Sequence, residues 1–426
     1  MSFVDELRWR GMLNNIMPGT EELLNREQVS GYIGFDPTAD SLHIGSMLQI
    51  TLLMRFQQAG HKPIALVGGA TGMIGDPSGK MQERKLLGVD DIKANEEGIK
   101  KQLEKFLDFD AAKSNAAEIV NNNDWFGEMR MITFLRDVGK YLTTNYLLSK
   151  GFVKDRLESG NELSFTEFNY ILMQAYDFLW LYENRNCKLQ MGGSDQWGNI
   201  TAGNELIHKK LRGEAYALTV PLVTKSDGTK FGKTESGNVW LDAKKTSVYK
   251  FYQFWLNVSD EDISKLMRYF SLKNREEIEA LEKQHSAAPH LRTLQKALAE
   301  ELTIRVHSTE ALQRAQETTA ILFGSSFEEF KRLSNEEIED AFDKDITYRI
   351  SKNLFDEGTD PVGLVGEIAA VFPSKGEARK SIQGNGVSIN KAKITLDKKI
   401  TAADLLHGKY LLVQKGKKNY YLIVAE

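Results

Sequence analysis

From Gln28 to Thr224 the chain alternates short apolar runs with longer stretches of helical periodicity. Strands separated by helices form βαβ units, and such units give a parallel sheet with ligands at the carboxyl ends of its strands. The alternation therefore predicts an α/β fold in which residues 1–223 form a Rossmann-like parallel-sheet domain. The expected strands are Val29–Phe35, Pro63–Val67, Ile119–Val120, Cys187–Met191 and Ala217–Val223.

Two segments between these strands carry apolar residues three and four positions apart, which is typical of a helix with one buried face. The first face consists of Ile44, Met47, Leu48, Thr51 and Leu52. The second consists of Phe165, Phe168, Ile171, Leu172, Ala175 and Leu179.

The rest of the chain divides into four segments by pattern. Residues 224–245 are a polar loop with a turn signal at Asp227-Gly228, and residues 246–322 are helical with only Pro289 as an interruption. Residues 323–345 form an acidic connector, which we expect to act as a linker, because Glu328 to Asp345 holds 8 acidic and 3 basic residues. Residues 346–426 predict a small, basic α+β domain.

In this last domain, Ser374 and Glu377 form a capping box that opens a short helix, and Gly384 is placed to end it. The alternating runs that follow predict strands at Val387–Asn390, Tyr410–Val413 and Tyr420–Val424.

The net charge of −4 is distributed unevenly. From Ser374 onward there are 11 Lys and Arg against 4 Asp and Glu, a net of +7, which leaves −11 for the preceding residues. A basic tail on an acidic body indicates a polyanionic partner, and the alternative is a solvated charged face. Clustering on structured elements favours a binding surface. The clusters are Lys375, Arg379 and Lys380 on the helix, and Lys415, Lys417 and Lys418 in a hairpin turn.

Composition excludes several classes of protein. With 41% hydrophobic, 10% aromatic and 27% charged residues the chain is globular, and no apolar stretch approaches the length that spans a bilayer. The N-terminus carries charges where a signal peptide would be apolar, so we expect a cytoplasmic protein without membrane contact. The single cysteine, Cys187, excludes an internal disulfide and a multi-cysteine zinc site.

Glycine-rich and polar segments follow the predicted strands. In Tyr32–Ser46, His43 and the amides before it lie at a helix N-terminus, a geometry that binds phosphate. Gly68–Lys80, followed by Arg84, allows close approach of backbone to a ligand but matches neither a Walker A nor a dinucleotide fingerprint. Alone, the histidine could be a capping residue and the glycine segment a mobile loop.

Three further segments carry polar residues or glycines that could contribute to a binding site. Tyr170, Gln174 and Asp177 share one helix face, which could line a pocket or a solvated edge. Leu189–Asn199 is another strand-to-helix turn at the same end of the sheet. The loop Lys225–Thr234 offers three lysines on a glycine-hinged segment, which could close over phosphates.

Together these segments resemble bacterial tyrosyl-tRNA synthetases, which are class I aminoacyl-tRNA synthetases, over essentially the whole chain. Residues Phe35–Ser46, ending His-Ile-Gly-Ser, resemble the first class signature (HIGH), and Lys230-Phe-Gly-Lys-Thr234 resembles the second (KMSKS). The tail resembles a small RNA-binding module that these enzymes share with a ribosomal protein. The resemblance implies ATP-dependent activation of L-tyrosine and its transfer to tRNA(Tyr), with ATP and Mg²⁺ as a substrate complex, no tightly bound cofactor or protein metal site, and a homodimer.

The resemblance also implies roles for individual residues. Tyr32 and Asp177 would contact the phenolic hydroxyl, and Asp76, Tyr170 and Gln174 the α-ammonium. Other members of the tyrosine site would be Gly34, Asp36, Gln190 and Gln196. The ATP-binding residues would be Thr38, His43, Gly45, Ser46, Gly193, Asp195, Leu222, Val223 and Lys233. The pyrophosphate would be met by Lys80, Arg84, Lys230, Lys233 and Thr234.

One position departs from the family pattern, because Ser46 stands where the first signature has its second histidine. A serine can still donate a hydrogen bond, but it is shorter and never cationic, so we expect it to replace the histidine incompletely. The rival interpretations are a tryptophan-specific synthetase, a nucleotidylyltransferase and a catalytically silent RNA-binding paralogue. The pair Tyr32 and Asp177 argues against a tryptophan-specific synthetase, and the basic tail argues against a nucleotidylyltransferase. The intact phosphate-facing residues argue against a catalytically silent paralogue.

Overall fold

The computed structural model describes residues 2–78, 86–234, 237–324, 327–342, 346–416 and 419–426. The chain packs into two compact units. The first consists of Met1–Thr246 with Trp255–Val306, and the second of Ser247–Phe254 with His307–Glu426. Helix α11 (Val248–Leu256) contributes residues to both.

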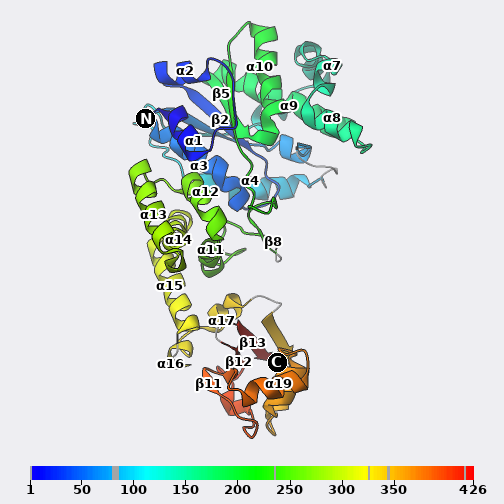
Figure 1. The fold of residues 1–426 in the computed structure, drawn as a ribbon. Coiled ribbons are helices and arrows are strands. Elements are labelled where there is room, and N and C mark those ends of the chain that lie inside the picture. The colour runs from blue at the N-terminus through cyan, green and yellow to red at the C-terminus, as the bar shows by residue number, and fades with distance from the viewer. Residues whose placement is uncertain (1, 79–85, 235–236, 325–326, 343–345, 417–418) are drawn as a thin grey trace. The chain divides into compact units, whose positions relative to one another are not determined.

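The first unit is built on a six-stranded sheet in the order β1-β6-β5-β2-β3-β4 (Figure 1). Every neighbouring pair from β6 to β4 is parallel, as the alternation predicts. The two-residue strand β1 pairs antiparallel with β6, so the sheet is mixed. The strands are β1 (Asn15–Ile16), β2 (Ser30–Phe35), β3 (Lys62–Val67), β4 (Glu118–Asn121), β5 (Cys187–Gly193) and β6 (Tyr216–Val220).

Helices cover both faces of this sheet (Figure 1). Successive side chains of a strand point to opposite faces of the sheet. On one face, Gly31 of β2 meets Phe56 of α3 (Ile44–Gln58). On the other face, Tyr32 of β2 packs against Phe178 of α9 (Phe165–Arg185). A Cβ at Gly31 would lie 2.9 Å from the Phe56 ring, so glycine lets α3 approach the sheet. Helices α9 and α10 (Trp197–Leu211) pack on each other and on β5, whose first residue, Cys187, is fully buried.

The first predicted helical face is buried throughout, and in the second Ile171, Leu172, Ala175 and Leu179 are buried, whereas Phe165 is 71% exposed because it lies in the first turn of α9. Each predicted strand of the first sheet is present with small shifts of its ends. The remaining helices of the first unit are α1 (Phe3–Arg10), α2 (Thr20–Arg26), α4 (Val89–Leu103), α5 (Asn123–Phe126), α6 (Met131–Asp137), α7 (Thr144–Leu148), α8 (Gly151–Glu158), α12 (Asp260–Phe270), α13 (Arg275–Ala287) and α14 (Thr293–Val306). Strands β7 (Lys233–Thr234) and β8 (Gly237–Asn238) pair with each other.

The second unit contains a five-stranded sheet in the order β11-β10-β12-β13-β9. Its strands are β9 (Thr347–Ile350), β10 (Val387–Ile389), β11 (Ala392–Lys393), β12 (Tyr410–Lys415) and β13 (Asn419–Ala425). Helix α19 (Lys375–Gln383) begins at the predicted residue, with the Ser374 hydroxyl accepting from the Glu377 amide, and Gly384 follows its last residue. This is one of the two bonds of the predicted capping box, and the described contacts of the helix do not include the reciprocal one. The other helices are α15 (Thr309–Phe323), α16 (Phe327–Phe330), α17 (Asn335–Ala341) and α18 (Pro361–Gly363).

The acidic connector differs from the linker that its composition suggested. Its described residues form α16 and α17, and Phe330, Leu333 and Ile338 are buried in a core with strand residues such as Tyr410 and Leu422. Glu339 of α17 accepts hydrogen bonds from Lys409 and from the Tyr410 hydroxyl, at 2.7 and 2.6 Å. The segment is therefore a folded layer on one face of the second sheet.

Candidate active site

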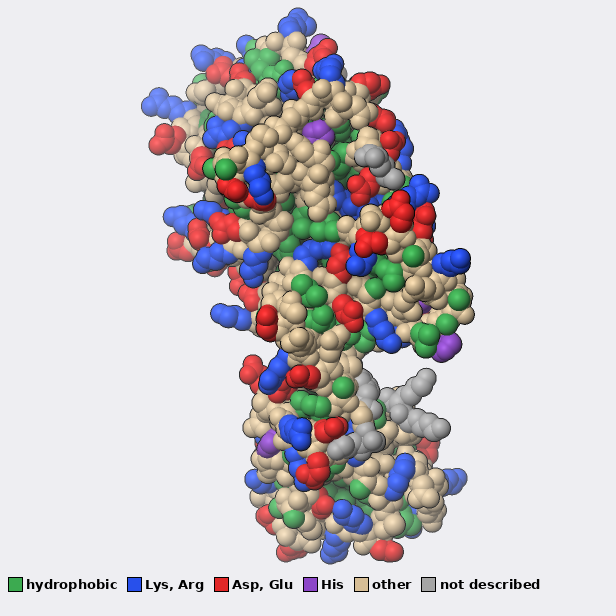
Figure 2. Space-filling view, turned by 90° about the vertical axis from the view of Figure 1, so that its left-hand side faces the viewer, with side chains coloured by type: hydrophobic (Ala, Val, Ile, Leu, Met, Phe, Trp, Pro, Cys, Tyr) green, Lys and Arg blue, Asp and Glu red, His purple; other side chains and the backbone are tan. Residues whose placement is uncertain are grey.

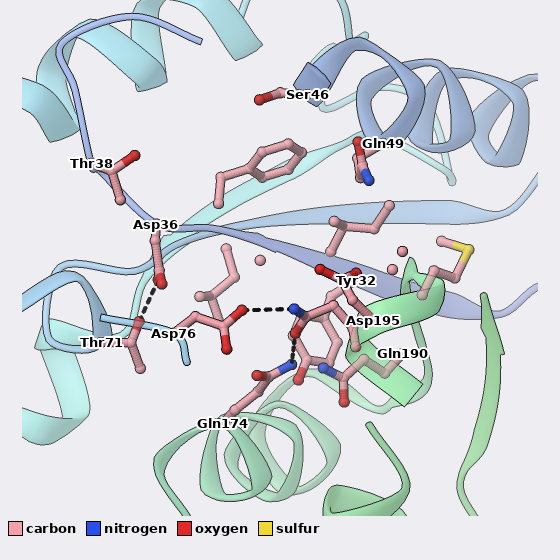
Figure 3. Close-up of a pocket in the computed structure, with 18 of the residues that line it drawn as sticks. Tyr32, Asp36, Thr38, Ser46, Gln49, Thr71, Asp76, Gln174, Gln190 and Asp195 are labelled. Carbon is pink, nitrogen blue, oxygen red and sulfur yellow. Dashed lines mark hydrogen bonds between the residues drawn. The ribbon is translucent and has the colours of Figure 1, made fainter. Parts of the chain in front are cut away.

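A cavity of about 330 Å³ lies at the carboxyl ends of β2 and β5 (Figure 3). This edge of the sheet is where parallel strands place ligands. Its lining includes most of the residues that the sequence analysis singled out: Tyr32, Gly34, Asp36, Thr38, His43, Gly45, Ser46, Asp76, Tyr170, Gln174, Asp177, Gln190, Gly193, Asp195, Gln196 and Leu222. These residues are separated by up to 190 positions in the chain, and the fold brings them together.

One wall of the cavity pairs Tyr32 from β2 with Asp177 from α9, which are 1% and 2% exposed. The Tyr32 hydroxyl has no hydrogen-bond partner, although it is buried. Burial raises the pKa of this hydroxyl well above its usual value, and the charge of Asp177 raises it further. The phenol is therefore held neutral and can both donate and accept.

Two donors hold the Asp177 carboxylate. Asn122 Nδ2 donates to Oδ2 at 3.1 Å, and Trp125 Nε1 donates to Oδ1 at 2.9 Å. Burial raises the pKa of Asp177 well above its usual value, and these two hydrogen bonds oppose that shift. The donors fix the orientation of the carboxylate beside the cavity.

A second cluster joins β2, α9 and the turn after β3. The Asp36 carboxylate accepts from Tyr170 OH at 2.7 Å and from Thr71 Oγ1 at 2.8 Å. Burial, followed by the charge of Asp36, raises the pKa of Tyr170, so this hydroxyl stays protonated. A Cβ at Gly68 would lie 2.1 Å from Asp36 Oδ1, so only glycine allows the turn to pass this carboxylate.

A chain of amides continues from this cluster (Figure 3). Gln196 Nε2 donates to Asp76 Oδ2 at 2.7 Å, and Gln174 Nε2 donates to Gln196 Oε1 at 3.3 Å. Asn199 of α10 donates to Gln174 Oε1 at 2.8 Å. The carboxylates of Asp36 and Asp76 thus give this side of the cavity negative charge, which suits a cationic group.

The opposite side is formed by the N-terminus of α3. His43 is the N-cap residue, and its ring lies edge-on to Trp240 at a centroid distance of 5.8 Å. A Cβ at Gly45 would lie 2.6 Å from His43 Cε1, so glycine is required beside the imidazole. The first amides of a 15-residue helix favour an anion here.

The loop Lys225–Thr234, which contains the segment resembling the second signature, lies next to α12 and buried aromatic residues of the first unit. Phe231 N donates to the Val223 carbonyl at 3.1 Å, and the Phe231 ring packs against Trp255 and Phe270. Burial and the charge of Asp76 raise the pKa of Asp195, and the charge of the exposed Lys230 opposes this rise. Val223 does not line the cavity.

Several predicted residues fall outside the structural description. Lys80 and Arg84 lie outside the described residues, as do Lys417 and Lys418. Lys233 and Thr234 form β7, but their side chains are not described. Their assigned roles remain predictions.

The sequence analysis missed four residues of this site: Gln49, Thr71, Asn122 and Trp125. Thr71, Asn122 and Trp125 fix Asp36 and Asp177. The run Asn121–Trp125 directly follows the predicted strand Ile119–Val120, at the edge where ligands bind. A polar run in that position was a usable signal.

The basic residues of the second unit are partly neutralised. Lys375, Arg379 and Lys380 are exposed on α19, with Lys375 paired to Glu367 at 2.5 Å. Lys415 donates to the Val371 carbonyl at 3.2 Å and lies over the Phe372 ring. On the face that Figure 2 shows, basic and acidic side chains of this unit are interspersed.

Comparison with known protein families identifies the class of enzyme to which the chain belongs. The family model described as tRNA synthetases class I (W and Y) matches residues 24–324, and the model described as Tyrosine--tRNA ligase SYY-like C-terminal domain matches residues 337–423. The chain belongs to the class I tRNA synthetases of this family.

Full-length relatives narrow the class further. The tyrosine--tRNA ligase of Bacteroides thetaiotaomicron is 57% identical over 100% of both chains, and that of Cytophaga hutchinsonii is 56% identical over 99% of both. A C-terminally truncated mitochondrial tyrosyl-tRNA synthetase from Aspergillus nidulans is 30% identical with a TM-score of 0.66, covering 75% of this chain and 94% of that chain. Within the class, the chain is therefore placed among the tyrosine--tRNA ligases. In the described part of the chain, no helix has the length and apolarity needed to span a membrane.

Proposed function

We propose that this cavity activates L-tyrosine with ATP to tyrosyl-adenylate, and that the chain transfers the tyrosyl group to the 3′ end of tRNA(Tyr). The observation that carries the proposal is the pair formed by the Tyr32 hydroxyl and the Asp177 carboxylate, both buried in the cavity wall. A phenolic hydroxyl can donate to Asp177 and accept from Tyr32, whereas phenylalanine would leave the Tyr32 hydroxyl without a partner and would give Asp177 no third donor.

The amino acid then lies with its ammonium toward Asp76, Tyr170 and Gln174. Asp36, Gly34, Gln190 and Gln196 complete this subsite. The negative charge of Asp36 and Asp76 supports the assignment, because a cation bound there would be stabilised. Tyr170 stays neutral, so its hydroxyl adds a polar contact without another charge.

ATP lies along the other side, with Mg²⁺ as its companion. Thr38 and His43 meet the phosphates at the N-terminus of α3, and Gly45, Ser46, Gly193, Asp195, Leu222 and Val223 surround the nucleoside. Lys80, Arg84, Lys230, Lys233 and Thr234 meet the leaving pyrophosphate. The N-terminus of the 15-residue helix α3, whose dipole favours an anion, and the reach of the Lys230 charge to Asp195 support this orientation.

In the first step, an oxygen of the tyrosine carboxylate attacks the α-phosphorus of ATP, and the bond to pyrophosphate breaks. The carboxylate is ionised at neutral pH, so no general base is needed. Catalysis consists of alignment together with stabilisation of charge on the phosphates. In the second step, a terminal ribose hydroxyl of tRNA attacks the adenylate carbonyl and AMP leaves.

The second unit binds the tRNA, and we place the enzyme in the cytoplasm, where protein synthesis uses its product. Lys375, Arg379 and Lys380 of α19 support this role because they are exposed on one short helix. Lys415 is held by its own domain, so we expect it to contribute less. Lys417 and Lys418 complete the proposed surface.

The active form is a homodimer. Among the described residues, 14 large hydrophobic side chains are exposed, and Met131, Ile132, Leu135, Leu148, Leu157 and Phe165 all lie in one stretch of the first unit. Exposed apolar clusters of this kind mark association surfaces. Sedimentation of the native chain and of the Ile132→Asp variant tests this, and a monomeric native chain contradicts it.

Tyrosine-dependent exchange of pyrophosphate into ATP tests the proposed activity. Exchange with tyrosine, and little with tryptophan or phenylalanine, supports it. Equal exchange with tryptophan, or none with any amino acid, overturns it.

A further inference from the structure

The hairpin that joins β10 to β11 has a two-residue turn, Asn390-Lys391, in which both residues have positive φ angles, of 51° and 65°. Two-residue hairpin turns with this backbone favour the pair Asn-Gly, because a side chain is disfavoured at positive φ. Lys391 therefore occupies a position at which glycine would fold more easily. Such strain persists only where the surrounding structure compensates for it.

The end of helix α15 supplies this compensation. Lys391 Nζ donates to the Gly324 carbonyl at 2.7 Å and also to the Leu322 carbonyl. The last carbonyls of a helix have no partner within the helix, and the helix dipole favours a cation beside them. Burial lowers the pKa of Lys391, and its Nζ lies 4.9 Å from the centre of the Tyr420 ring. A side chain from the second sheet thus closes the C-terminus of α15.

The turn that carries Lys391 is itself fixed to the rest of the second sheet. Asn390 Nδ2 donates to the Asp404 carbonyl at 2.6 Å, and Asn390 Oδ1 accepts from the Leu412 amide at 3.0 Å. The Asn390 amide donates to the Leu412 carbonyl at 2.8 Å. Because the turn is tied to β12 in this way, the bonds of Lys391 connect the whole sheet, and not only the hairpin, to α15.

We propose that Lys391 is a positioning residue for tRNA: it clamps the second sheet to the end of α15 and so keeps the proposed tRNA-binding surface ordered before tRNA arrives. This inference rests on the tRNA-binding role that we propose for the second unit. The apolar contact between α15 and the sheet is made by Leu322, which shares a buried core with Leu412 and Leu422. Apolar burial is not directional, so the clamp supplies the direction that this core lacks.

Order in the second unit matters because several basic side chains must meet the phosphates together. Helix α19, which carries Lys375, Arg379 and Lys380, packs on the same sheet through Ala378 and Ile382. A surface that becomes ordered only on binding loses part of its interaction energy to that ordering, whereas a preorganised surface does not. The Lys391 ammonium is already engaged by two carbonyls, so it acts through this docking and not by contact with a phosphate.

The test replaces Lys391 with glycine, the residue that the turn prefers, so the hairpin should still form while the clamp is lost. In the charging reaction, Lys391→Gly should raise KM for tRNA(Tyr) about 10-fold, the effect expected if roughly one molecule in ten keeps the docked arrangement. The kcat of charging and tyrosine-dependent pyrophosphate exchange should be unchanged. Lys391→Arg keeps a cationic donor and should recover most of the loss.

The salt dependence of tRNA binding separates a clamp from a direct contact. A lysine that contacts a phosphate adds about one unit to the slope of log affinity against log salt, so its removal flattens that slope. Lys391→Gly should weaken binding at every salt concentration and keep the native slope.

Hydrogen–deuterium exchange without tRNA gives the structural readout. The backbone amides in the last turn of α15 should exchange roughly 10-fold faster in Lys391→Gly, the equivalent of one charge-assisted hydrogen bond. Lys393→Met is the matched control, because it removes a lysine that is exposed on the same hairpin. It should leave the exchange of these amides unchanged.

The inference is overturned if Lys391→Gly charges tRNA with the native KM, if it flattens the salt slope, or if the end of α15 exchanges hydrogen as in the native chain. Failure of Lys391→Arg to recover KM also overturns it. Normal charging by a chain that ends at Gly324 would instead remove the proposed role of the second unit in tRNA binding.

Discussion

The Tyr32 hydroxyl contributes one oxygen to the cavity wall, and replacing Tyr32 by phenylalanine removes it while keeping the aromatic ring that packs on the sheet. Tyr32→Phe should lower kcat/KM for tyrosine roughly tenfold, because one hydrogen bond to the substrate phenol is lost. Activation of phenylalanine should not fall, since that substrate never used the hydroxyl. Pyrophosphate exchange with both amino acids measures the two effects.

Tyr410→Phe is the control for this change. It removes a tyrosine hydroxyl that is bonded to Glu339 in the second unit, far along the chain from the cavity. It should leave exchange unchanged. An equal loss with both amino acids in Tyr32→Phe would show that the hydroxyl supports structure rather than recognition.

Ser46 allows the converse experiment, in which a larger donor is added. Ser46→His should keep or lower KM for ATP, because the imidazole can reach further into the nucleoside side of the cavity. Circular dichroism should confirm that the variant is folded. A folded but inactive Ser46→His would mean that residues 35–46 are aligned incorrectly with the first signature.

Residues that line the cavity were predictable where they share one helix face or belong to a motif of the family that the sequence resembles. Tyr32, His43 and Asp177 are of this kind. For Asn122 and Trp125 the polar run after the predicted strand is a local signal, but their bonds to Asp177 were not predictable, because each joins residues more than fifty positions apart. Such a contact depends on how α9 packs beside the segment that follows β4, which no local pattern encodes.

At the scale of elements, the loop from Lys225 to Thr234 carries the two lysines that we place at the leaving pyrophosphate. Lys230→Ala and Lys233→Ala should each lower the rate of adenylate formation on the order of 10²–10³-fold, because the charge would act on the leaving pyrophosphate. Tyrosine affinity should barely change. Stopped-flow adenylate formation and equilibrium tyrosine binding separate the effects, and weakened binding at an unchanged rate contradicts the assignment.

Glu339 fixes α17 to the second sheet, and its effect on stability depends on pH. Hydrogen bonds from Lys409 and Tyr410 lower the pKa of Glu339 to about 2. A folded-state pKa below the unfolded value of 4.5 means that the stabilisation is complete above pH 4.5 and is lost as the pH falls toward 2. The side chain is 35% exposed, so solvent screening reduces the effect to about 1 kcal/mol.

Glu339→Gln should therefore lower the Tm of the second unit at pH 7, and the difference from the native chain should shrink toward pH 3. Differential scanning calorimetry across this range measures it. Glu336→Gln, at an exposed position of the same helix, should have little effect. A difference that is constant with pH would show that the carboxylate charge is not involved.

The long periodic elements were predictable, and so were the short strands β4 and β10, whereas β1 and β9 were not. Strand β1 has only two residues, and the four residues of β9, Thr-Tyr-Arg-Ile, contain no continuous apolar run. The pairing of β9 with β13 joins segments more than seventy residues apart. The connector was misjudged because its acidic composition hides apolar residues such as Phe330 and Ile338 at buried positions.

For the whole molecule, the acidic connector (residues 323–345) determines where the chain can be truncated. A chain ending at Gly324 should keep tyrosine-dependent exchange nearly intact and lose most tRNA charging, because it would lack the phosphate contacts that we propose for the tail. A chain ending at residue 345 should be less soluble, since Phe330, Leu333 and Ile338 would lose the sheet that covers them. Exchange, charging and light scattering on both truncations measure these outcomes.

Normal charging of tRNA by the chain ending at Gly324 would show that the tail is not the tRNA-binding module. Equal behaviour of the two truncations would show that α16 and α17 do not need the second sheet.

The burial of Cys187 makes the molecule convenient for spectroscopy. It is the only thiol in the chain, and burial raises its pKa to about 12, so almost none is thiolate at neutral pH. A maleimide dye should therefore ignore the native protein and react only at a cysteine introduced on the surface, for instance at Lys380. A fluorophore at that position would report the arrival of tRNA without any prior removal of native cysteines.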